Sequence, residues 1–146
     1  MPITFRPISY EKDLNGKQKE AYNLQKASAV LADLGFVTIR MTSDWGGADF
    51  IAQHLNGTFL KVQLKSRLTF SKKYLGQSLY VCFGERNPDR WYLYPHDEML
   101  KLNLNKRYIG KKFWDGHKDY SNPKPSKGQR VLLDQYQLKP GKSLSL

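Results

Sequence analysis

Three polar residues have the side-chain types that metal-assisted phosphodiester chemistry requires. Asp49 follows a pair of glycines, and a Gln-X-Lys motif formed by Gln63 and Lys65 comes shortly after it. A carboxylate and an amide oxygen are hard ligands of the kind that Mg²⁺ binds together with water and a substrate phosphate. A neighbouring lysine can orient the attacking water and offset the negative charge that develops on the phosphate.

The elements around these residues are expected to form a β-hairpin. Residues 48–54 and 58–65 read as strands, and Asn56-Gly57 between them is a strong hairpin signal. Apolar and polar residues alternate over residues 58–65, so Gln63 and Lys65 are expected on the face opposite the core. This alternation alone is more typical of a strand with a solvent-facing side than of a catalytic site.

The position of Asp49 favours the catalytic interpretation. If the hairpin is centred on Asn56-Gly57, paired positions have numbers that sum to about 113 or 114. Asp49 is then expected opposite Leu64 or Lys65 and diagonal to Gln63. A carboxylate, an amide and an ammonium group would meet at one end of the hairpin.

The other elements form an α/β pattern. A helix is predicted over residues 16–34, with Asn15 as its N-cap and Gly35 just after its end. The further predictions are an irregular segment over 1–13, strands at 36–41, 79–83 and 91–94, a turn at 44–47, a helix to about 102, a long loop over 105–128, and a helix or strand near 130–138.

The charge of the chain indicates a polyanionic partner. Its 146 residues include 24 Lys and Arg and 13 Asp and Glu, giving a net charge of +11, and all of this excess lies in residues 61–146. Nucleic acid is the commonest partner of such a surface, and an anionic membrane is the alternative. The side chains expected to contact DNA phosphates are Lys61, Arg67, Lys72, Lys73, Lys106, Arg107, Lys111, Lys112, Lys127 and Arg130.

The single cysteine and the histidines contribute little to this chemistry. Cys82 lies in an apolar strand and is expected to be inert core. The three histidines lack the spacing of metal ligands. Phe113 and Trp114 are expected either to stack on bases or to join the core.

The residues around the Gln-X-Lys motif resemble the PD-(D/E)XK nuclease superfamily over roughly residues 16–100. Asp49 corresponds to the aspartate of the motif, and Val62-Gln63-Leu64-Lys65 stands where members usually carry (D/E)-X-K. Glu20 matches a glutamate that many members place in the first helix. The glutamine is similar to the Q-X-K variant of intron-encoded homing endonucleases.

This resemblance implies an α/β, restriction-endonuclease-like core, with an N-terminal helix and then a mixed central sheet of about five strands flanked by helices. It also implies a Mg²⁺ cofactor, with Mn²⁺ as a substitute, held by Asp49, Gln63 and Glu20, with Lys65 completing the catalytic set. The expected function is a metal-dependent DNA endonuclease of the homing, restriction or junction-resolving type. Because Gln63 removes a charge from the site, the alternative is an inactive DNA-binding protein on the same fold.

The organisation of the chain agrees with such a protein. Residues 1–146 are expected to form a single nuclease-like domain, with a core at about 14–104 and a basic, aromatic, loop-rich part at about 105–146. No apolar run approaches the roughly 18 residues that span a bilayer, and residues 1–10 lack the apolar region of a signal peptide. A cytoplasmic, intracellular protein is therefore expected. Because duplex cleavage touches two strands, we expect a homodimer or homotetramer.

Overall fold

Seven short strands and five α-helices make up the chain in the computed structural model, which describes residues 1–45, 47–86 and 88–144, with the backbone alone for 43–45. In chain order the elements are α1 (Tyr10–Asp13), α2 (Gly16–Asp33), β1 (Phe36–Trp45), β2 (Ala48–His54), β3 (Phe59–Lys65), β4 (Leu68–Ser71), the 3₁₀ helix η1 (Lys72–Tyr74), β5 (Leu79–Glu85), β6 (Arg90–Pro95), α3 (His96–Asn105), α4 (Lys111–Gly116), β7 (Asp119–Asn122) and α5 (Lys127–Asp134).

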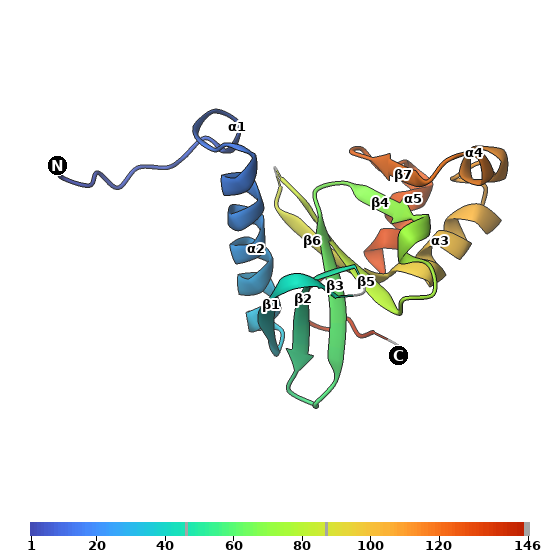
Figure 1. Ribbon diagram of the computed structural model, residues 1–146, viewed down its shortest axis with the longest axis horizontal. Coiled ribbons are helices and arrows are strands. Elements are labelled where there is room, and N and C mark those ends of the chain that lie inside the picture. Colours follow the sequence, from blue (N-terminus) through green and yellow to red (C-terminus); the bar gives the residue numbers. More distant parts are fainter. Residues whose placement is uncertain (46, 87, 145–146) are drawn as a thin grey trace.

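A mixed, five-stranded sheet of strand order β1-β2-β3-β5-β6 lies at the centre of the molecule (Figure 1). Strands β3 and β5 run parallel, whereas the other neighbouring pairs are antiparallel. Strands β4 and β7 form a separate antiparallel pair. The expected α/β class with a central sheet of about five strands flanked by helices is confirmed.

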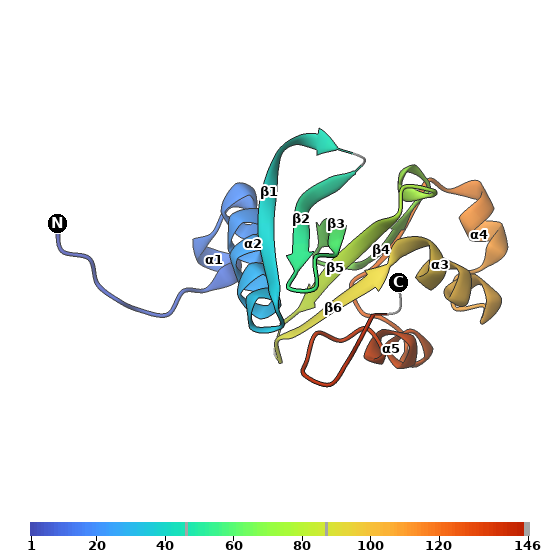
Figure 2. The same ribbon diagram turned by 90° about the horizontal axis from the view of Figure 1, so that it is seen from below.

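Helix α2 covers one face of the sheet. Its N-terminus carries the predicted cap, in which Asn15 and Gln18 bond reciprocally in a capping box. Gly35, just after the helix, has a φ of +92°, a left-handed conformation that favours glycine. Fully buried Ala27 and Leu31 pack in one apolar cluster with side chains of β2 and β3. Figure 2 shows α2 alongside the sheet, away from the other large helices.

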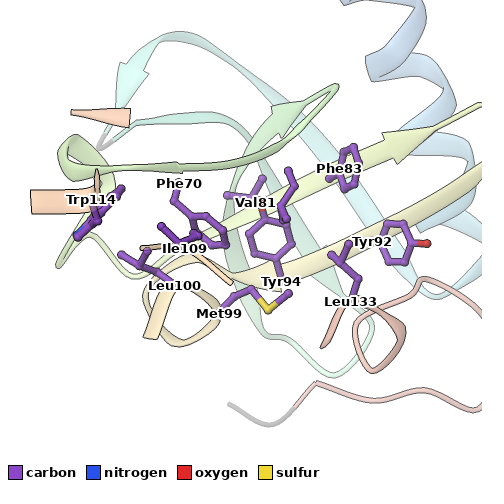
Figure 3. Packing of buried hydrophobic residues seen from close by; sticks show 11 residues of the cluster. Phe70, Val81, Phe83, Tyr92, Tyr94, Met99, Leu100, Ile109, Trp114 and Leu133 are labelled. Carbon is purple, nitrogen blue, oxygen red and sulfur yellow. The ribbon is translucent and has the colours of Figure 1, made fainter. Parts of the chain in front are cut away.

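The opposite face of β5 and β6 is covered by the second half of the chain. Leu68 and Phe70 of β4, Met99 and Leu100 of α3, and Leu133 of α5 form one apolar cluster with the sheet. Figure 3 shows how Phe70, Met99 and Leu133 converge on Val81 and Tyr94. Fully burying such side chains contributes about 1.5–3 kcal/mol each.

Residues 105–128 are not the single long loop that the sequence predicted. Helix α4 and strand β7 lie within this range, and α3 extends to Asn105. Trp114 is only 6% exposed and belongs to the core, so the stacking alternative for this residue is wrong. Strand β4 was not predicted, and it forms because β7 pairs with it across the sequence.

Two further segments differ from their predictions. Residues 1–13 contain the short helix α1, for which the Ser9 side chain accepts a hydrogen bond from the Lys12 amide at 3.3 Å. Strand β1 continues through Trp45, where a turn over residues 44–47 was expected. Gly46 of that turn lies outside the described residues. The last element, expected near 130–138, is the helix α5.

None of the helices in the described ranges has the length and apolar character needed to span a membrane.

Candidate active site

Asp49 and Gln63 lie across from each other at the start of β2 and the end of β3. The ladder pairs Phe50 with Val62 and Ala52 with Leu60, and one further step places Asp49 opposite Gln63. The predicted pairing of Asp49 with Leu64 or Lys65 is therefore wrong. Directly opposite residues of a ladder point to the same face, so the two side chains are neighbours.

The register differs from the prediction because the hairpin has a longer turn. The amide of His54 donates to the carbonyl of Thr58 at 2.8 Å, so three residues connect the strands instead of two. Gly57 has a φ of +92°, as the left-handed residue of a three-residue loop requires.

A hydrogen bond to the next strand fixes the carboxylate of Asp49. Its Oδ2 accepts from the backbone N–H of Leu64 at 2.8 Å, an N–H that would otherwise seek a partner in β2. The carboxylate therefore lies at the end of the ladder, beside Gln63, instead of moving freely in solvent.

Asp49 and Gln63 line one open pocket of about 580 Å³, which we call the site pocket. Its other walls include Arg40 of β1 and Lys73 and Tyr74 of η1. Gly47 also lines it, with a φ of +83°, and a Cβ there would come within 3.2 Å of the Tyr74 ring. The close approach of Tyr74 therefore explains why the second glycine of the pair is required.

Lys65 lies next to this pocket. It shares the polar face of β3 with Gln63, as predicted, and lines an adjoining pocket that we call the basic pocket. Lys73 and Tyr74 form part of both pockets. The ammonium groups of Lys65 and Lys73 lie 5.8 and 5.3 Å from the centre of the Tyr74 ring. Lys73 thus lines the same pocket as Asp49, and Lys65 lies in the adjoining pocket, as phosphate chemistry would need.

The segment that carries Lys73 and Tyr74 is held by a buried histidine that the sequence did not single out. His96, fully buried, accepts at Nε2 from the Ser71 N–H at 3.0 Å, and its Nδ1 lies 2.7 Å from Asp97 Oδ1. Asp97 Oδ2 accepts from the Gly76 N–H at 2.9 Å. These contacts fix both ends of the segment, and burial lowers the pKa of His96, so its neutral form is favoured.

Glu20 is not brought into either pocket. It is exposed on α2, and its spacing from Leu24, Ala27 and Leu31 places it on the sheet-facing side near the helix N-terminus. Helix α2 packs on the sheet face opposite that of Gln63. The role expected for Glu20 stays a prediction.

The basic residues expected to contact DNA have different surroundings. Arg67 and Lys73 are exposed and line the basic pocket. Arg130, in contrast, donates two hydrogen bonds to Glu85 at 2.9 and 2.8 Å, and this partner holds the pKa of the Glu85 carboxyl below its usual range. Lys61 and Lys72 are half-buried, and the Lys72 ammonium donates to the carbonyl of Asp115 at 3.2 Å. The other predicted contacts are exposed on the second half of the chain: Lys106, Arg107, Lys111, Lys112 and Lys127.

The prediction that Cys82 belongs to the core is confirmed, whereas Phe113 does not join the core. Cys82 is fully buried, and burial raises the pKa of its thiol to about 12, so it is unreactive. Phe113 is 44% exposed and stacks on His117 with ring centroids 3.9 Å apart.

The matches among solved structures include two nucleases. Hjc, a Holliday junction resolvase from the archaeal hyperthermophile Archaeoglobus fulgidus, gives a TM-score of 0.54 at 16% identity, over 87% of this chain and 99% of that chain. The bacterial homing endonuclease I-Ssp6803I gives 0.49 at 13% identity, over 84% and 94% of the two chains. No family model and no curated protein matches the sequence. The likeness to the resolvase confirms the restriction-endonuclease-like fold.

Proposed function

We propose that this protein is a metal-dependent endonuclease that hydrolyses phosphodiester bonds of DNA at the site pocket. The observation that carries the proposal is that Asp49 and Gln63 face each other in one open pocket, with Lys65 next along the same face of β3. The similar fold of a Holliday junction resolvase supports a nuclease, as does the net charge of +11.

The donor groups in the pocket fit a magnesium ion. Asp49 supplies a carboxylate and Gln63 an amide oxygen, and the pocket is open enough for water and a phosphate to complete the shell. Within the described residues no three His, Cys, Asp or Glu side chains gather as a metal site. The oxygen donors of Asp49 and Gln63 suit Mg²⁺, with Mn²⁺ as a substitute, better than zinc. When bound, the ion would polarise the phosphate for attack.

The lysines and the arginine of the pockets would act on the substrate itself. Lys65 would orient the attacking water and donate to a phosphate oxygen, because it follows Gln63 on the same face of β3 and lines the adjoining pocket. Lys73 and Arg40 would neutralise phosphate charge from the walls of the site pocket. The exposed basic residues of the second half would hold the flanking backbone, with DNA as the partner.

We propose that this protein is a homodimer or homotetramer of the homing, restriction or junction-resolving type. Such an enzyme must cut both DNA strands, and each chain carries one candidate site. Val37, Ile39 and Phe59 are 60, 49 and 61% exposed on the sheet face that carries Gln63. An uncovered apolar area of this kind is typical of an interface. Analytical ultracentrifugation tests this, since a monomer at micromolar concentration would leave only a nicking enzyme.

The direct test is cleavage of supercoiled plasmid and of a four-way junction, with Mg²⁺ and with EDTA. We expect cutting with Mg²⁺ or Mn²⁺, no cutting with EDTA, and at least a hundredfold lower rate for Lys65→Ala. Lys101→Ala is the matched control, because Lys101 is exposed on α3 and lines neither pocket. Equal rates for the two variants would remove Lys65 from the mechanism, and Glu20→Gln in the same assay tests Glu20.

A second candidate function is DNA binding without cleavage. Gln63 favours this function because it is uncharged, so the facing pair of Asp49 and Gln63 carries one negative charge instead of two. Lower charge weakens attraction for a cation. Salt-dependent DNA binding with no cutting at any Mg²⁺ or Mn²⁺ concentration would support this candidate and contradict the endonuclease.

A further inference from the structure

The basic pocket adjoins the candidate active site, with Lys73 and Tyr74 in both linings. It measures about 260 Å³ and is lined by Lys65, Arg67 and Lys73 together with Asp119. Three cations and one carboxylate give these side chains a net charge of +2 (3 − 1). The exposed hydroxyl groups of Ser66 and Ser121 also line it. Cations and hydroxyls around one concavity are the donors that a phosphate group accepts from.

The cations of this pocket outnumber its one carboxylate, Asp119, and are not paired with it. In the ranges that the structure describes, none of Lys65, Arg67 and Lys73 forms an ion pair. Lys65 and Lys73 nevertheless approach the same ring of Tyr74. Grouping like charges costs free energy, and an anion between them would repay that cost. An anion bound among the three cations would therefore stabilise this arrangement.

The two pockets are immediate neighbours. Both pockets are lined by Lys73 and by Tyr74, which is only 2% exposed. A DNA strand bound in one pocket therefore passes directly into the other. Each strand of duplex DNA carries one phosphate per roughly 3.4 Å of helix axis, so a strand with one phosphate in the site pocket has further phosphates close by on either side.

We propose that the basic pocket binds a second phosphate of the DNA strand being cut, next to the scissile phosphate, with Arg67 as its principal ligand. This inference rests on the proposed nuclease function. The phosphate is either an internal diester or a terminal monoester at a strand end, since both offer the same oxygens. Asp119 opposes binding through its negative charge, and therefore limits the affinity of the pocket for phosphate.

The test is fluorescence anisotropy of DNA binding in EDTA, where no cleavage occurs, with Arg67→Gln, Asp119→Asn and the control Lys101→Gln. We expect Arg67→Gln to weaken binding about tenfold and to reduce the slope of log K against log salt by about 0.9, the loss of one contact. Asp119→Asn should tighten binding about twofold or more. Arg67 is exposed, so the variant should fold.

Two substrates distinguish the source of the phosphate. A nicked duplex with a 5′-phosphate is compared with the same duplex carrying a 5′-hydroxyl, beside an intact duplex. A gain from the 5′-phosphate that Arg67→Gln abolishes supports a terminal phosphate, whereas a slope change on the intact duplex supports an internal one.

Two results would overturn the proposal. One is that Arg67→Gln and Lys101→Gln behave alike on every substrate. The other is that Asp119→Asn leaves affinity unchanged, because the Arg67 contact would then lie outside the pocket. Absence of cleavage in the plasmid assay would contradict the proposed function and leave this binding test intact.

Discussion

At the scale of single residues, Gln63 has the largest effect on what the site pocket can do. It brings an oxygen donor opposite Asp49 without a second charge. The identities of Asp49, Gln63 and Lys65, and their common face, could be predicted from the sequence, because strand alternation is local. Tyr74 and Arg40 could not, and Lys73 was predicted only as a DNA contact, because these residues come from segments brought to the pocket by the fold.

Substituting Gln63→Glu should strengthen metal binding. A second carboxylate opposite Asp49 raises the attraction for a divalent cation, so the Mg²⁺ concentration for half-maximal cleavage should fall about fivefold or more. A Mg²⁺ titration of plasmid cleavage measures this. Gln53→Glu is the control, because Gln53 lies on the same face of β2 but away from the pocket. An unchanged half-maximal concentration in Gln63→Glu would argue against Gln63 as a ligand.

His96 should make the stability of the fold depend on pH. Burial lowers its pKa below the ordinary 6.5 of the unfolded chain, so the unfolded chain takes up the proton first as the pH falls. Its contribution is therefore complete above about pH 6.5 and is lost as the pH drops through the lowered pKa of the folded protein. Protonation would also turn Nε2, the acceptor for the Ser71 N–H, into a donor.

Urea unfolding of wild type and His96→Gln between about pH 7.5 and 5 measures this dependence. The free energy of unfolding of wild type should decline more steeply below about pH 6.5, and His117→Gln, at an exposed position, should behave like wild type. Parallel curves for wild type and His96→Gln would contradict the assignment.

At the scale of elements, some parts of the fold follow from the local sequence, whereas others depend on pairing between distant segments. Helix α2 could be predicted with both caps, since its periodicity and its N-cap Asn15 lie in the local sequence. Strands β4 and β7 span four residues each, and their pairing joins segments far apart in the chain. The register of the hairpin was wrong because Asn56-Gly57 is typical of a two-residue turn, while the chain uses three.

Helix α5 is joined to β5 by Arg130 and Glu85, so we expect Arg130→Ala to reduce stability more than DNA affinity. The bidentate pair is partly buried, and its loss should cost about 1–2 kcal/mol by thermal or urea unfolding. Lys127→Ala, on the same helix but exposed, should leave stability near that of wild type. If Arg130→Ala is as stable as wild type but binds DNA tenfold more weakly, Arg130 is instead a DNA contact, as the sequence predicted.

The β5–β6 pair depends on the small size of Gly84. A Cβ at this position would come within 2.5 Å of the Trp91 ring, opposite it in the ladder. Gly84→Ala should therefore lower the free energy of unfolding by about 1–3 kcal/mol, by overpacking. Gly16→Ala is the control, since nothing lies within 4 Å of its Cβ position, and it should be neutral or slightly stabilising. Equal stability of the two variants would contradict the close packing.

At the scale of the whole molecule, the two faces of the central sheet have different roles, one in supporting the fold and the other in carrying the candidate active site. Helix α2 and its apolar partners support one face, and the other face carries Asp49, Gln63 and Lys65 at the edge of the basic second half. The excess of basic residues in 61–146 predicted a polyanion partner without indicating where they lie, since sequence charge carries no position.

The proposed cleavage chemistry depends most directly on the charge of Asp49. Asp49→Asn keeps an oxygen that can accept from the Leu64 N–H but removes the negative charge, so the fold should survive while metal binding fails. The measurement is the single-turnover rate of plasmid cleavage with Mg²⁺, compared with Asp33→Asn at an exposed position of α2. We predict a rate at least a hundredfold lower for Asp49→Asn, with DNA affinity in EDTA not weakened. Cleavage by Asp49→Asn at the rate of Asp33→Asn would contradict the account.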